Sequence, residues 1–359
     1  MADSKQAPLD SAAAAKAAFA SVQDKPFPDD IFTAPELRWA VIGCGVIANQ
    51  MAQSLALAGR KLAGVANRTL SKAQAFAEQY GIEKVYDTVE DLYADPDIDA
   101  IYITTPHNTH ITYLRAALAA GKHVLCEKAI TLNSAELDEA CAIADEHNVV
   151  LMDATTVLHM PLYQELRRRM DAGEFGRMNL AQLNFGSYKE YGDLTNRFYN
   201  RNLAGGAMLD IGVYALSVMR LFMASQPAEV VSLGNTFETG VDVAGGIVCR
   251  NAEQQLGVVS LTLHSKQPKR SVISFDKCYI EVNEYPRADH ATIVWTADGH
   301  REEVHAGTEA YALCYEMADL EQAVAGDDSK RELLDYASDV MELMTKFRAD
   351  WGVVYPEEE

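Results

Sequence analysis

The stretch LRWAVIGCGVIA, residues 37–48, decides which fold the rest of the chain must complete. An apolar run ends at Ile42, and the pattern G-x-G-x-x-A begins at the next residue, Gly43. The residues that follow, ANQMAQSLALAG, have a helical pattern, so the glycines lie between a predicted strand and a predicted helix. This context favours dinucleotide binding over an ordinary strand–helix turn.

Each small residue of this turn has a physical task. Gly43 permits the tight turn, and Gly45 lets the backbone approach a pyrophosphate without an intervening Cβ. Ala48 allows the helix to pack closely on the strand. The helix begins at Val46 and Ile47, where free N–H groups and positive potential attract phosphate. We therefore expect Gly43, Gly45, Val46 and Ile47 to bind the cofactor.

Strands and helices alternate from this turn to about residue 155, which is typical of βα units on a parallel sheet. Beyond it the strands follow in series with hairpin-like connections, so they predict an antiparallel sheet. We predict an N-terminal arm over 1–36 and a Rossmann domain with a doubly wound parallel sheet over 37–155. An α+β domain with a large, mostly antiparallel open sheet is predicted over 156–359. The arm is expected to be a disordered tail, or to pack on a partner subunit or over a ligand.

Composition supports about two domains and argues against several classes of partner. The chain has 359 residues, of which 48% are hydrophobic, and its formal net charge is −21. A surface of this charge disfavours nucleic acids and anionic membranes, because both are bound through Lys and Arg. No apolar run approaches the roughly 18–20 residues of a membrane helix. We therefore expect a small-molecule substrate, no nucleic acid and no membrane.

Cysteine usage and the second sheet predict the compartment and the assembly. None of the six cysteines forms a Cys-x-x-Cys pair or a spacing with histidine typical of zinc. We expect reduced thiols, a cytoplasmic protein and no metal. The N-terminus lacks the charged and then apolar order of a signal peptide. An open sheet with an uncovered face would expose a large apolar patch, so we expect a homo-oligomer formed through the C-terminal sheet.

The residues after the second predicted strand bear on the choice between NAD and NADP. NAD sites commonly place Asp or Glu about 20 residues after the glycines, to bind the ribose hydroxyls. This chain has Asn67 and Arg68 there, without an acid. Arg68 can bind a 2′-phosphate or stack on adenine, unless it is a solvated loop residue. We predict that both residues bind NAD(P), with NADP slightly favoured.

Three further polar residues could meet at one substrate carbon. Lys128 follows Glu127 at the carboxyl end of a central strand, where open α/β sheets bind ligands. Asp210 and Tyr214 are four residues apart in a predicted helix, so they project from one face. If that face meets Lys128, the three groups form a site. The alternatives are an ion pair of Lys128 with Glu127, an Asp210 that serves the helix dipole, and a Tyr214 in the core.

Four blocks of the sequence resemble the glucose–fructose oxidoreductase / inositol dehydrogenase (Gfo/Idh/MocA) family. They are AVIGCGVIA, ITTPHNTHITYLRAALAAGKHVLCEKAITLN, GGAMLDIGVY and MELMTKFRADWGVVYP, and the resemblance covers residues 37–356. The family's most frequent lysine motif is Glu-Lys-Pro, where this chain has Ala129, and many members have His in place of Tyr214. Both departures, and FETGVD, resemble the branch of dimeric dihydrodiol dehydrogenases. Glucose–fructose oxidoreductase also uses Tyr at this position.

The resemblance implies reversible hydride transfer between nicotinamide and a secondary alcohol of a sugar, polyol or cyclic diol. It implies that Lys128 bonds the reacting oxygen and a cofactor ribose hydroxyl. Tyr214 would donate and accept the proton, and Asp210 would orient substrate hydroxyls. The expected cofactor contacts on the nicotinamide side are Thr105, Pro106, Asn108, His110, Glu127 and Lys128.

The chemistry agrees with these implied assignments. Oxidation of an alcohol needs a base that takes the hydroxyl proton as hydride leaves. A free phenol has a pKa near 10, and a nearby lysine ammonium would lower it by stabilising phenolate. We therefore expect Lys128 to lower the pKa of Tyr214 and to assist it as acid and base.

The substrate is predicted from polar side chains on the second domain. The candidates for substrate binding are His159, Tyr188, Lys189, Arg197, Tyr199 and Asn202, together with Asp210 and Tyr214. Such groups could bond several hydroxyls, which favours a pyranose, such as glucose within a glycoside oxidised at a ring hydroxyl. The alternatives are a dihydrodiol or dicarbonyl substrate, internal recycling of a tightly bound NAD(P), and a non-catalytic NAD(P)-binding sensor.

Overall fold

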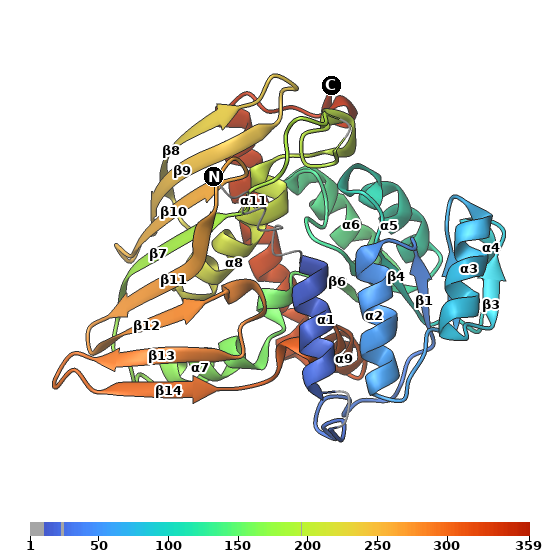
Figure 1. The fold of residues 1–359 in the computed structure, drawn as a ribbon, viewed down its shortest axis with the longest axis horizontal. Helices are drawn as coiled ribbons and strands as arrows, with labels where there is room; N and C mark the ends of the chain where they lie inside the picture. Colours follow the sequence, from blue (N-terminus) through green and yellow to red (C-terminus); the bar gives the residue numbers. More distant parts are fainter. Residues whose placement is uncertain (1–10, 23–24, 195) are drawn as a thin grey trace, which may run out of the picture.

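The computed structural model describes residues 11–22, 25–194 and 196–359. Its first half contains a sheet of six parallel strands in the order β3-β2-β1-β4-β5-β6 (Figure 1). The strands are β1 (Trp39–Ile42), β2 (Gly64–Ala66), β3 (Lys84–Tyr86), β4 (Ala100–Ile103), β5 (His123–Cys126) and β6 (Leu151–Asp153). This order is that of a doubly wound dinucleotide-binding sheet, so the predicted Rossmann topology is confirmed.

The strand side chains alternate between two apolar layers, and helices cover both. In β1, Ala40 and Ile42 belong to one layer, whereas Trp39 and Val41 belong to the other. The first layer contains α4 (Val89–Ala94), α5 (His110–Ala119) and α6 (Ser134–Glu146), and the second contains α2 (Val46–Leu57), α3 (Leu70–Tyr80) and α9 (Ala312–Val324). Because both faces are buried, these strands appear in the sequence as continuous apolar runs.

Helix α9 comes from the end of the chain, but its apolar side lies in the core of the first sheet. Leu313, Met317 and Leu320 are buried with strand residues such as Val41 and Tyr102. The chain therefore returns to the first domain after it has built the second. The domain boundaries drawn at residues 36 and 155 stay a prediction.

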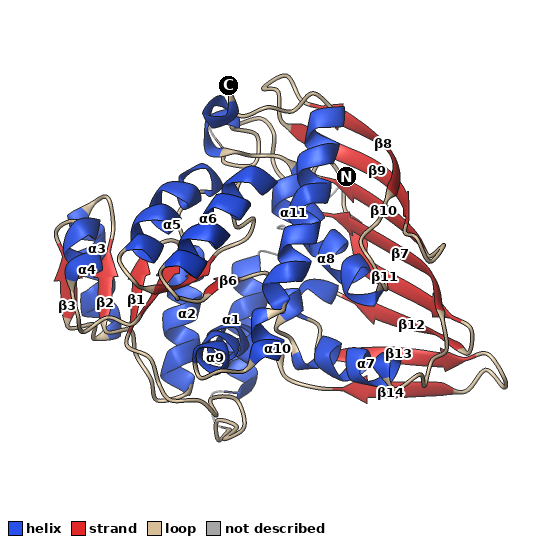
Figure 2. Cartoon of the chain, turned by 180° about the vertical axis from the view of Figure 1, so that it is seen from behind, coloured by secondary structure: helices blue, strands red, loops and turns tan. Residues whose placement is uncertain are grey.

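The second sheet has eight strands in the order β14-β13-β12-β11-β7-β10-β9-β8 (Figure 2). They are β7 (Met178–Gly186), β8 (Glu229–Thr236), β9 (Asp242–Arg250), β10 (Leu256–Thr262), β11 (Gln267–Phe275), β12 (Cys278–Asn283), β13 (His290–Trp295) and β14 (Arg301–His305). Neighbouring strands are antiparallel except β7 and β10, which run parallel. The predicted large and mostly antiparallel sheet is confirmed.

Helices of the second half lie on one face of this sheet, between it and the first domain (Figure 2). They are α7 (Pro161–Asp171), α8 (Val213–Phe222) and α11 (Leu333–Asp350), while α10 (Asp328–Arg331) packs on α9 and α11. In both views the opposite face is bare of helices within the described part of the chain. Val231 and Leu233 of β8 are 73% and 82% exposed on it.

One helical segment is apolar and long enough, by length and composition, to cross a membrane. It is Arg201–Phe222, with a mean hydropathy of 1.3 over its most apolar window. This differs from the expectation that no run is long enough. Within the protein 83% of that window is buried, and α8 packs on α11 and on the second sheet. Packing inside the fold therefore accounts for its apolar character.

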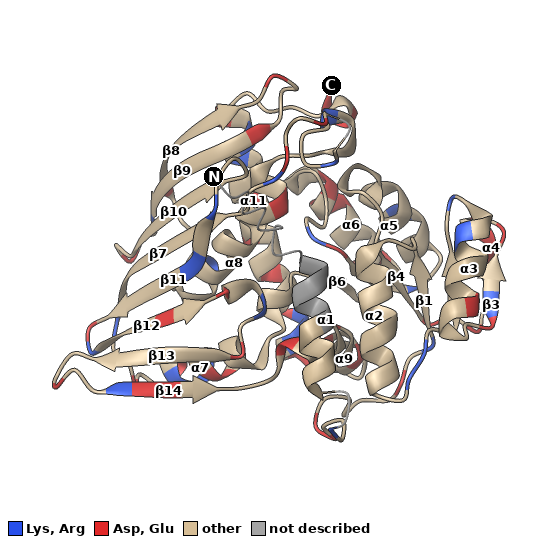
Figure 3. Ribbon diagram, viewed as in Figure 1, with Lys and Arg blue, Asp and Glu red and all other residues tan. Residues whose placement is uncertain are grey.

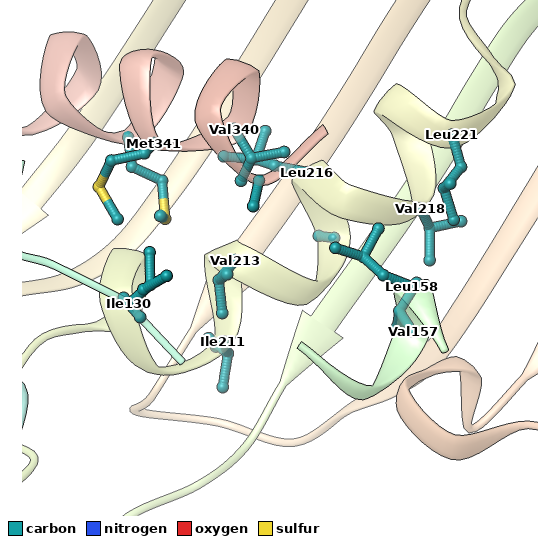
Figure 4. Packing of buried hydrophobic residues seen from close by; sticks show 14 of the residues in the cluster. Ile130, Val157, Leu158, Ile211, Val213, Leu216, Val218, Leu221, Val340 and Met341 are labelled. Atoms are coloured by element: carbon teal, nitrogen blue, oxygen red, sulfur yellow. The ribbon is translucent and has the colours of Figure 1, made fainter. Parts of the chain in front are cut away.

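An apolar cluster joins the two domains (Figure 4). Ile130, which follows β5 of the first domain, packs with Ile211 and Val213, which lead into α8. Val340 and Met341 of α11 complete the cluster, and all five side chains are almost completely buried. Burial of such a side chain contributes about 1.5–3 kcal/mol relative to exposure. The cluster therefore fixes the end of β5 relative to the start of α8.

The arm contains a helix, α1 (Ser11–Val22), that packs on its own chain. It lies beside α2 and contacts the turn Glu309–Tyr311 (Figure 1). Val22 is buried, and the ring of Phe27 meets the ring of Tyr311 at 5.0 Å between centroids. Over this segment the arm is therefore helical and packed on its own chain, and it is not a disordered tail. Residues 1–10 of the predicted arm lie outside the described residues.

Candidate active site

The turn between β1 and α2 has the geometry that a pyrophosphate needs. Gly43 has a φ of +104°, and a Cβ there would lie 2.6 Å from Thr104 Oγ1. A Cβ on Gly45 would meet no atom within 4 Å, so space lies open in front of the helix. Among the described residues no side chain caps α2, which leaves its first N–H groups without a side-chain partner. The turn therefore has room for the phosphates of NAD(P), and Gly43, Gly45, Val46 and Ile47 are the residues that would hold them.

Asn67 and Arg68 lie at the end of β2, beside this turn. The N–H of Gly43 donates to the carbonyl of Ala66 at 2.9 Å, which joins the two segments. Asn67 Nδ2 donates to the carbonyl of Thr69 at 3.0 Å. Arg68 is exposed and has no ion pair or hydrogen bond within the described part of the chain. Its guanidinium is therefore available to a ligand at the adenosine side.

The segment after β4 carries the predicted contacts of the nicotinamide side. Pro106 precedes a short helical turn, and the hydroxyl of Thr105 accepts from Thr109 Oγ1 at 2.8 Å. Asn108 Nδ2 donates to the carbonyl of Asn202 at 3.2 Å and to Glu357 Oε1 at 2.7 Å. Asn108 therefore joins the first domain to the second and to the C-terminus. Asn202 takes part through its backbone.

His110 cannot contact a cofactor in this structure, which corrects the prediction. Its side chain is completely buried. Nδ1 lies 3.0 Å from the carbonyl oxygen of Ala129, and Nε2 lies 2.8 Å from that of Thr105. Burial lowers the pKa of the imidazole. His110 thus holds together the ends of β4 and β5 behind Lys128, because it is the first residue of α5 and points inward.

His107, which the sequence analysis did not single out, makes a second bridge. Its Nε2 lies 3.1 Å from the carbonyl oxygen of Lys128, and its Nδ1 lies 3.3 Å from that of Ala204 in the second domain. Burial lowers its pKa to about 3, and the charge of Lys128 adds to this effect. A neutral imidazole therefore supports the backbone of Lys128.

His159 is also completely buried, so the prediction that it lines the substrate site is wrong for this structure. Its Nδ1 lies 2.9 Å from Asp319 Oδ2, and its Nε2 lies 2.8 Å from the carbonyl oxygen of Asp153. Burial alone would lower its pKa, but Asp319 and Glu316 outweigh burial and raise it. His159 thus lies in a buried acidic group, in which Lys330 Nζ also pairs with Asp319 Oδ1 at 2.6 Å, and burial raises the pKa of Asp153 and of Glu316.

Lys128, Asp210 and Tyr214 meet at one point between the two domains. Lys128 Nζ donates to the Asp210 carbonyl at 2.7 Å and lies 3.3 Å from Asp210 Oδ1. It also lies 4.8 Å from the centroid of the Tyr214 ring. The side chains of Lys128 and Asp210 are only 12% and 9% exposed. No group of three or more His, Cys, Asp or Glu is placed to hold a metal ion in the described chain.

A π-helical turn, Met208–Gly212, carries Asp210 into this site in place of the regular helix that was predicted. Remote segments hold the turn, since Asp242 Oδ2 accepts from the N–H of Met208 at 2.6 Å. The hydroxyl of Tyr355 donates to the carbonyl of Gly205 at 2.7 Å. Gly206 has a φ of +132°, and a Cβ there would lie 2.3 Å from Asp242 Oδ1. Such turns often mark functional sites.

Burial and charge set the protonation of the three groups. Burial raises the pKa of Tyr214 above its usual value, although the Lys128 ammonium opposes this shift. The prediction that the lysine gives a lowered pKa is therefore wrong in net direction. Burial would lower the pKa of Lys128, but Tyr214 and Asp210 outweigh it and raise the value. Burial would raise the pKa of Asp210, but Lys128 and Arg197 hold it well below its usual range.

Glu127 lies beside Lys128 and accepts a hydrogen bond from the hydroxyl of Tyr102. Burial raises its pKa, whereas Tyr102, Lys128 and Arg287 oppose the shift. Arg287 belongs to the second domain and donates to Gln50 Oε1 of α2 at 3.2 Å. Tyr102 and Arg287 were missed from the sequence. The signal for Tyr102 was a hydroxyl within the otherwise aliphatic strand AIYI.

The remaining substrate candidates follow β7. Arg197 Nη2 donates to Asp210 Oδ1 at 3.1 Å, so its guanidinium belongs to the site. Tyr188 is 42% exposed and lies near Tyr191, outside the group bonded to Asp210. Tyr199 is completely buried, and its hydroxyl donates to the carbonyl of Lys189 at 3.2 Å. Tyr199 therefore fixes the backbone of this segment and does not face a ligand.

Known sequences match both domains. Residues 37–155 match the oxidoreductase family with the NAD-binding Rossmann fold, and residues 163–281 match the GFO/IDH/MocA C-terminal domain. A trans-1,2-dihydrobenzene-1,2-diol dehydrogenase of Xenopus tropicalis is 32% identical over 251 residues, which are 68% of this chain and 74% of that protein. The chain belongs to the Gfo/Idh/MocA oxidoreductase family. It is an NAD(P)-binding oxidoreductase.

Solved structures of two other enzymes share the fold. Levoglucosan dehydrogenase in complex with NADH and levoglucosan superposes with a TM-score of 0.76 at 19% identity, over 88% of this chain and 97% of that one. A 3-ketoreductase of Actinomadura kijaniata, in complex with NADP and TDP-benzene, has a TM-score of 0.75 at 24% identity over 88% and 98%. At these identities the likeness concerns the fold alone.

Gly45→Ala should leave the fold intact and weaken the binding of NAD(P). Its Cβ would meet no protein atom but would occupy the space where the backbone approaches a phosphate. We expect the dissociation constant to rise about tenfold, which is about 1.4 kcal/mol, in a calorimetric titration. Gly43→Ala is the matched control, because its Cβ would collide with Thr104 and should lower the melting temperature of the protein even without cofactor. Wild-type affinity in Gly45→Ala, or an equal loss of stability in both variants, would contradict this account of the turn.

Proposed function

We propose that this oxidoreductase interconverts a secondary alcohol and a ketone on a sugar or glycoside, with NAD(P) as the redox partner. The observation that carries the proposal is the Lys128 ammonium, bonded to Asp210 and 4.8 Å from the Tyr214 ring. Lysine from the nucleotide domain and tyrosine from the other domain can then reach the same substrate oxygen. NAD(P), when bound, supplies the hydride acceptor or donor.

Tyr214 is the proton donor and acceptor in this proposal. Because its pKa is raised, the resting phenol keeps its proton and can give it to a ketone oxygen during reduction. In the oxidation of an alcohol, the phenolate oxygen takes the hydroxyl proton. The Lys128 ammonium stabilises phenolate and the oxygen of the substrate, and Asp210 stays ionised and accepts from substrate hydroxyls.

A hydroxyl-rich substrate is supported by the polar groups that surround the reacting position. Asp210 and Arg197 can each bond a hydroxyl, and loss of one such bond discriminates strongly between substrates. The fold shared with sugar-linked enzymes supports the same choice. A trans-dihydrodiol is the second candidate, since the relative at 32% identity carries that name. A panel of glycosides and dihydrodiols, followed at the nicotinamide absorbance, separates the two.

Tyr214→Phe should lower turnover by about 10²–10⁴-fold while NAD(P) affinity stays nearly unchanged, because the phenol moves a proton and does not hold the cofactor. In the wild type, the rate of alcohol oxidation should rise with pH between about 7 and 10, since phenolate forms as pH approaches a raised pKa. Steady-state rates on the preferred glycoside measure both effects. The variant should lose the alkaline rise.

Tyr113→Phe serves as the control for this substitution, because Tyr113 lies on α5 and no hydrogen bond joins its hydroxyl to the described residues. Its turnover and pH profile should match the wild type. Equal turnover in Tyr214→Phe and the wild type would remove Tyr214 from the proton transfer. Binding of NAD(P) without turnover of any glycoside or diol would favour a sensor.

NADP is the proposed preferred cofactor, on the basis of the exposed guanidinium of Arg68 and the absence of an acid at the end of β2. Arg68→Ala should raise KM for NADP by about tenfold, because the variant loses one charge-assisted contact with the 2′-phosphate. KM for NAD, which lacks this phosphate, should change little. Initial rates with both cofactors provide the measurement. A parallel rise for both cofactors would instead assign Arg68 to adenine stacking.

The bare face of the second sheet is the proposed homo-oligomer contact. Its apolar side chains at β8 to β10 are Val231, Leu233, Val248 and Leu256, which are 73%, 82%, 46% and 40% exposed. Contiguous apolar surface of this kind is typical of association sites. Leu233→Glu should shift the protein to a smaller species in light scattering after gel filtration, whereas Glu78→Lys on α3 should not. An unchanged mass for Leu233→Glu would reject this face.

A further inference from the structure

Cations gather at the proposed reacting position of a chain whose net charge is −21. Acidic residues occur on elements of both domains (Figure 3). Around Asp210, by contrast, the charges of Lys128, Arg197 and Lys189 all act on one carboxylate. Lys128 comes from the first domain, and the two others come from the segment that follows β7.

Lys189 is connected to the reacting position through a continuous set of contacts. Lys128 lies over the Tyr214 ring and beside Asp210, and Asp210 bonds Arg197. The guanidinium carbon of Arg197 lies 4.3 Å from the centroid of the Phe198 ring. Lys189 Nζ lies 4.1 Å from the same centroid. Two cations, one of which is bonded to Asp210, therefore share one aromatic ring.

Apart from the Phe198 ring, the Lys189 ammonium has no ion-pair or hydrogen-bond partner among the residues that the structure describes. No carboxylate or hydrogen-bond acceptor of the described chain contacts its Nζ, whereas the neighbouring Lys269 pairs with Glu284 at 2.9 Å. The backbone of Lys189 is fixed, because its N–H donates to the carbonyl of Leu263 at 2.8 Å. The three N–H donors of this half-buried ammonium thus form no hydrogen bond within the described chain, and they are open to a ligand carboxylate.

The charges of the site do not balance without a ligand. Lys128, Arg197 and Lys189 all act on the single carboxylate of Asp210, while Glu127, the other acid beside Lys128, is opposed by the charge of Arg287. Oδ1 of Asp210 already serves both Lys128, at 3.3 Å, and Arg197, at 3.1 Å. Burial lowers the pKa of Lys189, and Arg197 and Lys128 add to this shift, whereas Asp210 opposes it. At least one positive charge is therefore left over beside the reacting position.

We propose that Lys189 binds a carboxylate of the substrate, so that the preferred substrates are sugar acids, such as hexuronic acids and their glycosides. The inference rests on the proposed function and names the substrate class of that same site. Lys128 and Arg197 share Asp210, whereas no carboxylate pairs with Lys189 in the described chain. A single ammonium suits a monoanionic carboxylate better than a phosphate ester, which carries about 1.5 to 2 negative charges at pH 7.

The experiment compares methyl glucoside, methyl glucuronide and glucose 6-phosphate as substrates of the full chain with NAD and with NADP. The value of kcat/KM for the glucuronide should exceed that for the glucoside by about tenfold or more, as expected for one charge-assisted bond. Lys189→Gln should lower this ratio about tenfold, mainly through KM. Lys189→Arg should keep most of it, because the cation is retained. Lys266→Gln, an exposed lysine near β11, is the control and should leave the ratio unchanged.

The outcomes separate this inference from the proposed function. Turnover of the glucoside at a rate equal to or above that of the glucuronide would overturn the inference and leave the proposed function standing. An equal effect of Lys189→Gln on both substrates would overturn it in the same way. Preference for glucose 6-phosphate would also overturn the inference, because the site would then select a phosphate and not a carboxylate. Turnover of dihydrodiols without turnover of any sugar would reject both proposals.

Discussion

The hydrogen bond from Lys128 Nζ to the Asp210 carbonyl crosses from one domain to the other, and the geometry of the site depends on it. A single bond of this kind contributes about 1.5–3 kcal/mol, which is too little to hold two domains in register. The apolar cluster around Ile130 and Ile211 supplies that register, because it fixes the backbone just beyond Lys128 and just after Asp210. Packing therefore sets the position of the Lys128 backbone and of the Asp210 carbonyl. The hydrogen bond between Lys128 Nζ and this carbonyl then forms between groups that packing has already brought together.

The sequence was sufficient for the parts of the fold that depend on local pattern. The glycine turn, the alternation of strands and helices, and the change to serial strands are all local features, and they predicted both sheets. Lys128, Asp210 and Tyr214 could be chosen because a strand end and a helix face restrict where their side chains point. The π-helical turn at Asp210 could not be foreseen, since it depends on Asp242 and on Tyr355, which lie far away in the sequence.

Histidines show most clearly where sequence reasoning fails. His110 and His159 each follow a strand end, a place at which a side chain can face a ligand or the core with the same local sequence. Tertiary packing turns both side chains inward, where their ring nitrogens lie within hydrogen-bond distance of backbone carbonyl oxygens and, for His159, of Asp319. The predicted direction of the pKa shift of Tyr214 was wrong for a related reason. Proximity to a lysine can be inferred from two motifs, but the loss of water around the phenol depends on the whole fold.

The anchors of the site explain why sequence blocks so far apart act together. Asp242 holds the first N–H of the turn that carries Asp210, and Tyr355 holds the carbonyl just before that turn. His107 supports the Lys128 backbone from the first domain and contacts Ala204 in the second. Each anchor is buried and fixes backbone, so the turn keeps its shape whether or not the charges around it are balanced. If the proposed function holds, a ligand that balances the charges of Lys128, Arg197 and Lys189 would do so without moving this backbone, and its binding energy would act at the reacting position.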